Sequence, residues 1–258
     1  LVDEIWTPSR FCADAFRSAF EGPVHVMPHA VDLKLAGHIT RRSLGIEDDA
    51  FVVHYSLDAH SSLARKNPGA VWDAIERAFP DEDSILLLRV RNLDHVLDHA
   101  RDGDHEAHRL LEILEHQNVF LVDEELSHPE VLDLMALSDC YVSLHRSEGF
   151  GYTIAEAMGL GKPVVATNYG GNCDFMDESC AWPVPHRTVE VQPDQFPFWE
   201  HGQTWAEPNV DEAARALVAI RQGGATVSAK SAEARVRVSQ NLSLAALASA
   251  YRSGLGFE

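Results

Sequence analysis

The sequence predicts an α/β fold in which a parallel sheet carries helices on both faces. Short apolar runs alternate with segments of helical periodicity along most of the 258 residues. The loops between them are short, and 45% of the residues are hydrophobic, which is enough for a substantial core. Strands that alternate with helices form parallel sheets that are buried on both sides, so these observations together favour this fold class.

Each predicted strand is a short apolar run bounded by polar or turn-forming residues. These runs occupy residues 5–6, 24–27, 51–55, 85–90, 119–122, 140–144, 164–166 and 181–184. Helical periodicity fits residues 10–20, 68–79, 94–101, 105–116, 129–137, 152–160, 210–222 and 229–251, and the last of these is expected to be broken. Residues 187–208 depart from the alternation, and their Pro, Gln and aromatic residues predict an ordered excursion. Ligands of parallel sheets bind beyond the carboxyl ends of the strands, so the site is expected in the strand-to-helix turns.

The formal net charge of −19 argues against several classes of function. Nucleic-acid binding depends on clustered Lys and Arg, and docking on anionic lipid is disfavoured for the same reason. A phosphate-bearing ligand would therefore be held by a few local cations and backbone dipoles, against the field of the whole chain.

The four cysteines show neither a C-x-x-C spacing nor a metal-like grouping, which predicts reduced thiols in a cytoplasmic protein. Cys140 lies in an apolar run and is expected to be buried. No apolar run reaches the roughly eighteen residues that a membrane span needs. The chain opens Leu-Val-Asp-Glu-Ile-Trp, without an initiator Met or a basic leader, and we interpret this as the start of a fragment.

The most informative segment leads from the predicted strand 140–144 into the predicted helix 152–160. Gly149 and Gly151 lie in the loop between them, where glycine lets a ligand approach the backbone closely. The N–H groups of the first helical turn, together with the Thr153 hydroxyl, are typical of an anion site.

Two carboxylates belong to the same segment, Glu148 in the loop and Glu156 about one turn into the helix. Each can accept hydrogen bonds from hydroxyl groups, which is how a ribose or hexose diol is held. From the spacing alone, a capped helix with one solvated Glu is an equally acceptable interpretation. Residues 149–154 lack the last glycine of the dinucleotide fingerprint, and Lys162 is not followed by the Ser or Thr of a Walker loop.

The stretch Ser147-Glu-Gly-Phe-Gly, followed by Ala-Glu156-Ala-Met and by Gly-Lys-Pro-Val-Val-Ala-Thr167, resembles the E-x7-E region of family 4 glycosyltransferases. That family has the GT-B fold, so the resemblance implies a Rossmann-like domain that corresponds to its C-terminal half. It implies that Glu148 contacts the donor sugar and that Glu156 holds the ribose hydroxyls of the nucleotide. It also implies that the sugar and the diphosphate face the backbone around Phe150, Gly151, Tyr152 and Thr153.

A basic pair, Arg65 and Lys66, precedes the predicted helix 68–79 in this otherwise acidic chain. Cations at a helix start oppose the helix dipole, so an anionic ligand would explain them, although a solvated pair is the simpler alternative. The position resembles the family's diphosphate-binding loop, in which Lys66 matches the Lys that neutralises the leaving group. The family usually adds an Arg about six residues earlier. Here His60 lies near that position, and Arg65 is the possible substitute.

Further parts of the resemblance are less specific. Gly170 and Gly171 resemble a small-residue turn that approaches the diphosphate, although a plain turn also fits. His145 and Arg146 border the proposed site, either as surface-loop residues or as sugar contacts. The resemblance covers about residues 1–222, the expected donor-binding domain, and leaves 223–258 as a helical extension. The family's N-terminal acceptor domain is expected to be absent from this chain.

The histidines of residues 95–108 lie among aspartates, and His95 and His99 share a helix face. A metal site would need a closed set of ligands, so we favour a solvated helix–loop–helix. Asp102-Gly-Asp104 and residues 81–83 imitate the Asp-x-Asp signature of metal-dependent sugar transferases. Neither follows an apolar strand, so both are predicted to be solvated turns.

These observations predict a metal-independent, retaining transfer of a sugar from a nucleoside diphosphate to an unknown acceptor, without a cofactor. The candidate catalytic residues are Lys66, Arg65 and Glu148, and Glu156 leads the donor-binding set. Alternatives are a non-catalytic module that binds nucleotide sugars, and a sugar-nucleotide epimerase or phosphorylase with the same architecture. The predicted partners are a nucleotide sugar and the N-terminal domain of the same enzyme.

Overall fold

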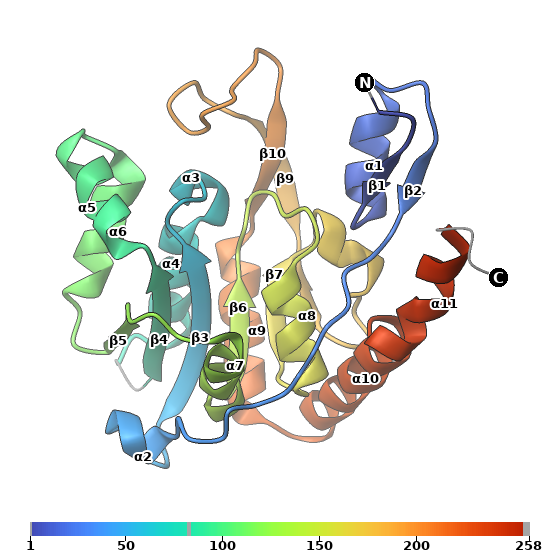
Figure 1. Cartoon of the computed structure of the whole chain (residues 1–258). Coiled ribbons are helices and arrows are strands. Elements are labelled where there is room, and N and C mark those ends of the chain that lie inside the picture. Colours follow the sequence, from blue (N-terminus) through green and yellow to red (C-terminus); the bar gives the residue numbers. More distant parts are fainter. Residues whose placement is uncertain (1, 82–83, 255–258) are drawn as a thin grey trace.

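The computed structural model describes residues 2–81 and 84–254, and its centre is a six-stranded parallel sheet (Figure 1). The strands lie in the order β5, β4, β3, β6, β7, β8, and neighbouring strands are parallel throughout. Their bounds are β3 (Phe51–Asp58), β4 (Ser84–Arg91), β5 (Val119–Val122), β6 (Cys140–Ser143), β7 (Val164–Thr167) and β8 (Trp182–Val184). The predicted fold class is confirmed.

The direction in which the sheet grows reverses between β3 and β6. The strands β3, β4 and β5 extend to one side in chain order, and β6, β7 and β8 extend to the other. The chain leaves two adjacent strands toward opposite faces at such a reversal, which opens a crevice at their carboxyl ends. The predicted site segments around Lys66 and Glu148 follow β3 and β6, so the topology brings them to one point.

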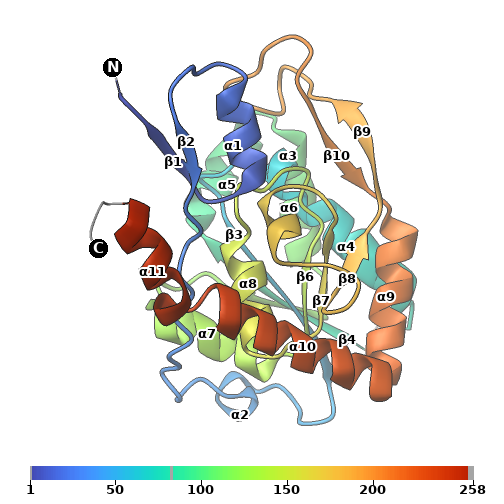
Figure 2. The same cartoon turned by 90° about the vertical axis from the view of Figure 1, so that its right-hand side faces the viewer.

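Helices cover both faces of the sheet (Figures 1 and 2). The residues buried on one face come from α4 (Pro68–Ala78), α5 (Leu93–Arg101), α6 (His105–Leu114) and α9 (Val210–Gln222). The other face is covered by α7 (His128–Leu137), α8 (Tyr152–Gly159) and α10 (Ala225–Asn241). Trp72 of α4 and Met158 of α8 are only 2% and 0% exposed. Burying such side chains stabilises the fold by about 1.5–3 kcal/mol each, so these two layers hold the strand ends in place.

The first strands of the chain form a small unit beside the main sheet. β1 (Ile5–Thr7) and β2 (Val24–Val26) pair in parallel and are joined by α1 (Arg10–Arg17). The chain then follows the α8 face, where Val31 is buried, down to the short helix α2 (Arg41–Leu44) (Figure 1). The helix α11 (Leu244–Gly254) returns to this unit, where the Tyr251 hydroxyl donates to the Pro28 carbonyl at 2.8 Å. The predicted strands 5–6 and 24–27 therefore pair with each other and not with the six-stranded sheet.

Residues 187–208 are ordered, as predicted, and belong to an antiparallel hairpin. It consists of β9 (His186–Glu190) and β10 (Thr204–Pro208) and projects beyond the carboxyl ends of the main sheet (Figure 1). Trp205 is 4% exposed and packs with Ala64 of the short helix α3 (Leu63–Lys66). The Ser62 hydroxyl donates to the Gln195 carbonyl at 2.7 Å. The hairpin is thus attached to the segment that ends in Lys66.

Element boundaries differ from the predictions where elements are short or polar. β3 continues beyond its predicted end at Tyr55 to Asp58, because its last residues remain paired with β4. α2 and α3 span a single turn each, too short for periodicity to reveal. The expected break in the last helix falls between α10 and α11.

Two further sequence predictions concern the acidic turn 81–83 and the lack of a membrane span. The acidic turn 81–83 lies partly outside the described residues, so its interpretation stays a prediction. Within residues 2–81 and 84–254, no helix is both long enough and apolar enough to cross a membrane.

Candidate functional site

The loop after β6 turns the chain from the sheet into α8, and a glycine permits the turn. Gly151 precedes α8 with φ of +88°, in the left-handed region that favours glycine. The helix therefore begins at the carboxyl edge of the sheet, as predicted. The first N–H groups of a helix lack intrahelical acceptors and form the positive end of its dipole. Thr153 adds a hydroxyl to this turn, which accepts from the Tyr141 hydroxyl at 2.7 Å. The turn has the features of an anion site.

Lys66 and Glu148 are 82 positions apart in sequence and meet where β3 and β6 end. The Lys66 Nζ donates to the Glu148 Oε2 at 2.7 Å, and the Arg65 Nη1 lies 3.7 Å from the same oxygen. The side chains of Lys66 and Glu148 are only 20% and 19% exposed. Burial alone would raise the pKa of Glu148, but Lys66 and then Arg65 outweigh it and lower the pKa to about 2. Glu148 is therefore ionised at neutral pH.

Glu156 extends from α8 with a side chain that is only 2% exposed. Its Oε1 lies 2.5 Å from the Nε2 of His128, the first residue of α7. Burial raises the pKa of Glu156, and the hydrogen bond from His128 partly opposes that effect. A carboxylate with one such partner keeps free lone pairs. Glu156 can therefore accept further hydrogen bonds from hydroxyl groups.

A cavity of about 460 Å³, here called the crossover cavity, lies at the carboxyl ends of β3 and β4 between α7 and α8. Lys66, Tyr152, Thr153 and Glu156, all predicted site residues, line it. Its volume suits a small ligand. It thus joins the cation of α3, the first turn of α8 and the buried carboxylate of Glu156 in one space.

Gly170 and Gly171 pack against the Glu148 loop and are not part of the cavity wall. A Cβ on Gly171 would lie 2.0 Å from the Gly149 carbonyl oxygen, and one on Gly170 would lie 2.4 Å from that of Glu148. The Gly171 N–H donates to the Glu148 carbonyl at 2.8 Å. Any side chain here would push the loop away, so these glycines fix its position. Their predicted approach to a diphosphate stays a prediction.

His60 and Arg65, the two possible second cations, do not line the crossover cavity. The side chain of His60 is 67% exposed, and its ring contacts that of His95 with centroids 5.0 Å apart. Arg65 donates through Nη1 to the Ser147 carbonyl at 2.7 Å. Arg65 therefore supports the Glu148 loop, whereas His60 belongs to a neighbouring surface.

His145 and Arg146 are both buried, so neither is a surface-loop residue. His145 is 0% exposed, with Nε2 donating to the Tyr169 carbonyl at 2.9 Å and Nδ1 lying 3.0 Å from the Ser143 hydroxyl. Burial lowers the pKa of His145, which keeps the ring neutral. Arg146 donates to Glu207 of the hairpin at 2.9 Å and to the Ala64 carbonyl at 2.8 Å. Both side chains brace the loop, and Arg146 ties it to α3 and the hairpin.

Five ionisable residues that sequence reasoning missed also line the cavity: Asp58, Arg89, Arg91, Glu125 and His128. Arg89 and Arg91 end the otherwise apolar strand Ile-Leu-Leu-Leu-Arg-Val-Arg, at the edge where ligands of parallel sheets bind. Two cations at the end of an apolar strand were the sequence feature that could have identified these residues as part of the site. His128 resembled an ordinary helix start before Pro129, and nothing in the sequence relates it to Glu156.

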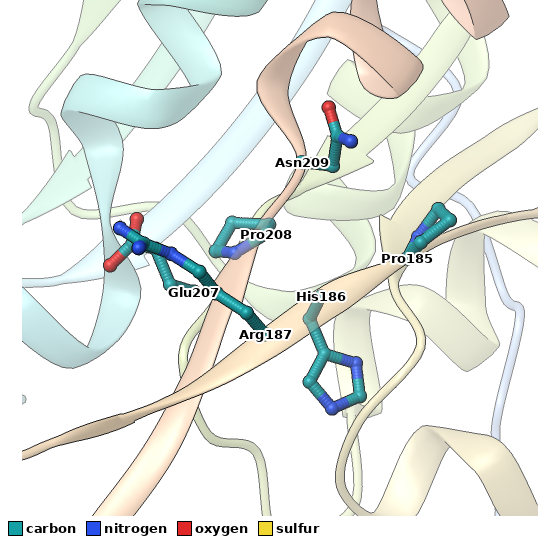
Figure 3. Close-up of a pocket in the computed structure, with 6 residues that line it drawn as sticks. All are labelled: Pro185, His186, Arg187, Glu207, Pro208 and Asn209. Atoms are coloured by element: carbon teal, nitrogen blue, oxygen red, sulfur yellow. The ribbon is translucent and has the colours of Figure 1, made fainter.

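Two other cavities hold none of the predicted site residues. One, about 530 Å³ and here called the hairpin cavity, lies between α3, the α5–α6 turn and the hairpin loop. The other, about 270 Å³, lies at the base of the hairpin, where Arg187 and Glu207 are neighbours on paired strands (Figure 3). Glu207 is already paired with Arg146, at 2.9 Å.

The histidines of α5 and α6 do not form a metal site. Among the described residues, no group of three or more His, Cys, Asp or Glu side chains is arranged to hold a metal ion. His95 and His99 do share a helix face, with ring centroids 4.3 Å apart. Asp104 caps α6 by accepting from the Ala107 N–H at 3.0 Å, which confirms that Asp102-Gly-Asp104 is a turn between helices.

The fold is similar to that of solved GT-B glycosyltransferases, and part of the chain matches a glycosyltransferase family model. Residues 100–190 match the family model described as Glycosyl transferases group 1. That stretch contains Glu148 and Glu156 and is about a third of the chain.

The chain is also similar to particular proteins and solved structures. Two sequences of the O-antigen biosynthesis glycosyltransferase WclY from Escherichia coli are 30% and 33% identical over 100 residues, which are 37% of this chain and 28% of that protein. The sucrose-phosphate synthase of Thermosynechococcus elongatus superposes with a TM-score of 0.72 at 18% identity, over 100% of this chain and 60% of that chain. Alr3699/HepE of Anabaena, solved in complex with UDP and glucose, gives 0.71 at 18% identity, over 99% and 64%. The chain therefore spans less than two thirds of each of these relatives.

Proposed function

We propose that this chain binds the nucleoside-diphosphate sugar used by a retaining, hexosyltransferase-type glycosyltransferase. The observation that carries the proposal is the contact between Lys66 and Glu148 at the mouth of two strand-to-helix turns, next to the buried Glu156. A carboxylate for the sugar, a cation for the diphosphate and a carboxylate for the ribose are then neighbours. This is the order in which those groups follow one another along a nucleotide sugar.

In the proposed reaction, the bond between the anomeric carbon and the diphosphate oxygen breaks, and the sugar acquires oxocarbenium character. Negative charge grows on the leaving diphosphate, where Lys66 and the N–H groups of the first turn of α8 stabilise it. Glu148 orients the sugar by accepting hydrogen bonds from its hydroxyls, and Glu156 holds the ribose. Glu148 is not the nucleophile in this scheme, because its role is that of a hydroxyl acceptor.

The acceptor would be held by a part of the enzyme outside this chain. The chain accounts for 60% and 64% of the two solved relatives, which leaves room in such proteins for a further domain. We therefore propose that this chain alone binds the donor without transferring the sugar.

We also propose that donor binding needs no divalent metal. The charge of the diphosphate would be met by Lys66 and the helix N-terminus, and Asp102 and Asp104 do not line the crossover cavity.

Calorimetric titration tests these proposals. The panel consists of UDP, GDP, ADP and dTDP together with their glucose derivatives, each with EDTA and again with added Mg²⁺. We expect one diphosphate series to bind equally well under both conditions. Failure of every nucleotide to bind would contradict the donor site, and binding that EDTA abolishes would contradict metal independence. Sugar transfer to an added acceptor by this chain alone would contradict the division of roles.

A further inference from the structure

The charged side chains of the crossover cavity can be paired one by one, beginning with Arg91. Arg91 extends from the end of β4, where its Nη1 lies 3.6 Å from Asp58 and its Nε lies 3.9 Å from Glu125. Both of these carboxylates line the cavity as well. Arg91 is thus offset by negative charge within its own surroundings.

When the other charged side chains of the cavity are paired, one cation, Arg89, remains without an ion-pair partner among the described residues. Lys66 is bonded to Glu148, and Glu156 is bonded to His128. Arg89 also lines the cavity, yet it makes no hydrogen bond or ion pair with any residue that the structure describes. Its Nε is buried and lacks a partner. Arg89 as a whole is half-buried, and a buried N–H of a charged group without a partner is costly, which calls for an explanation.

The two register partners of Arg89 on the sheet carry no negative charge. Its register partners are Ser56 on β3 and Val122 on β5. His54, whose Nε2 lies 3.1 Å from the Ser56 hydroxyl, is fully buried, and burial lowers its pKa to about 4, so its ring is neutral. Burial lowers the pKa of Arg89, and Arg91 acts in the same direction. The more distant charges of Asp58 and Glu125 oppose this effect without reversing it. The wall around Arg89 therefore disfavours its charge.

We infer that Arg89 is a second cation for the phosphates of the donor, supplied by β4 in addition to Lys66 after β3. This inference rests on the proposed function and identifies one more residue of the same site. The guanidinium presents several N–H donors in a planar fork, which suits two phosphate oxygens at once.

The assignment also answers which residue supplies the second cation predicted from the sequence. His60 is exposed beside His95, and Arg65 is bonded to the Ser147 carbonyl, so neither is free within the cavity. Arg89 is. A base carbonyl would satisfy one N–H but would leave the positive charge without a counterion, so a phosphate is the better match.

The test compares wild type with Arg89→Met and Arg89→Lys in titrations with UDP, UMP, uridine and inorganic pyrophosphate. If another base binds better in the panel above, the corresponding nucleotide series is used. Arg89→Met should weaken UDP and pyrophosphate roughly tenfold to a hundredfold, as expected for a charge-assisted contact to a shielded phosphate, and leave uridine unchanged. Arg89→Lys should recover part of the loss. Arg77→Met, which removes an exposed charge on α4 outside the cavity, is the matched control and should change nothing.

Thermal unfolding without ligand provides a second readout. Since the buried Nε of Arg89 has no partner in the described part of the chain, Arg89→Met should keep or raise the melting temperature while it weakens ligand binding. A residue with a purely structural role would show the opposite.

Three results would overturn the inference: unchanged UDP affinity in Arg89→Met, an equal loss with uridine, or a variant that is less stable or does not fold. Each is distinct from failure of the proposed function, which would appear as absent nucleotide binding in the wild type.

Discussion

The crossover cavity and the hairpin cavity both border α3 and have similar volumes, about 460 and 530 Å³. Both contain carboxylates and histidines, but those groups are used differently. In the hairpin cavity, Asp104 caps its own helix and Glu106 is paired with the bracing residue Arg146. In the crossover cavity, groups from separate strand ends face one another, and Arg89 makes no hydrogen bond or ion pair within the part of the chain that the structure describes.

The difference shows that cavity size is a poor guide to this molecule. Charges that satisfy helix ends or neighbouring loops are part of the fold. Charges that converge from different strands, buried and only partly satisfied, are available to a ligand. The predictions below test this distinction, beginning with the largest expected effect.

Lys66→Ala should produce the largest loss. Removing the cation should weaken UDP roughly tenfold to over a hundredfold, the value of a charge-assisted hydrogen bond to a shielded phosphate, and leave uridine unaffected. Isothermal titration measures both, with the exposed Lys34→Ala as the control and circular dichroism as the check of folding. An unchanged UDP affinity would place the diphosphate elsewhere.

Glu156→Gln should weaken every ligand that contains the ribose. The amide keeps the size of the side chain but loses the charge and one acceptor, so UDP and uridine should lose affinity alike, by about tenfold. Titration of both ligands, and of UDP-glucose, checks this. If uridine were unaffected while UDP became weaker, Glu156 would be a phosphate-side residue and its assignment would be wrong.

Glu148→Gln should affect only the intact donor. UDP affinity should stay the same or rise, because Lys66 is then free, while the advantage of UDP-glucose over UDP should fall by up to about tenfold. The ratio of the two dissociation constants is the measurement. Equal losses for both ligands would show that the sugar does not lie on Glu148.

Acid stability should also report on Glu148. Its pKa is about 2 in the folded protein and near 4.5 ordinarily, so its ionised form stabilises the fold above the ordinary pKa. That contribution, up to about 3 kcal/mol, is lost as the pH falls from about 5 toward 2. Urea unfolding at several pH values should show wild type losing its advantage over Glu148→Gln across this range. The exposed Glu124→Gln should follow wild type, and an advantage that is independent of pH would contradict the assignment.

The smallest effect is expected beside the hairpin cavity. Substituting His95 and His99 together by Ala removes ring contacts and the 3.3 Å contact between His99 Nδ1 and Asp104 Oδ2. Neither histidine lines the crossover cavity, so UDP affinity should not change. The wild-type melting temperature should not rise with added Zn²⁺, because these side chains do not converge on an ion. A Zn²⁺-dependent rise that the double variant loses would reveal a metal site at α5.

The sequence predicted those parts of the molecule that depend on local pattern. The six strands of the sheet, α8 with its glycine turn, and the placement of Glu148 and Lys66 at strand ends all follow from periodicity and turn chemistry. The direct bond between Lys66 and Glu148 did not, because it depends on strand order across 82 positions.

Other features depend on packing that no local pattern records. The pattern of an apolar strand ending in Arg89 and Arg91 is visible in the sequence, but it does not show which of the two lacks a partner. The separate pairing of β1 with β2 is equally hidden, since each resembles a strand of the main sheet. The roles of Arg146 and of the two glycines after β7 required knowledge of which backbones touch.

The bond between Lys66 and Glu148 has a consequence for turnover under the proposed function. In the empty site the cation and the carboxylate neutralise each other, so a diphosphate must compete with Glu148 for Lys66. An intact donor compensates by offering sugar hydroxyls to the displaced carboxylate. Once the sugar has left, the nucleoside diphosphate offers nothing in return, and Glu148 reclaims Lys66. The contact between Lys66 and Glu148 therefore lowers the affinity for the nucleoside diphosphate relative to the intact donor. It also speeds the dissociation of the nucleoside diphosphate after transfer.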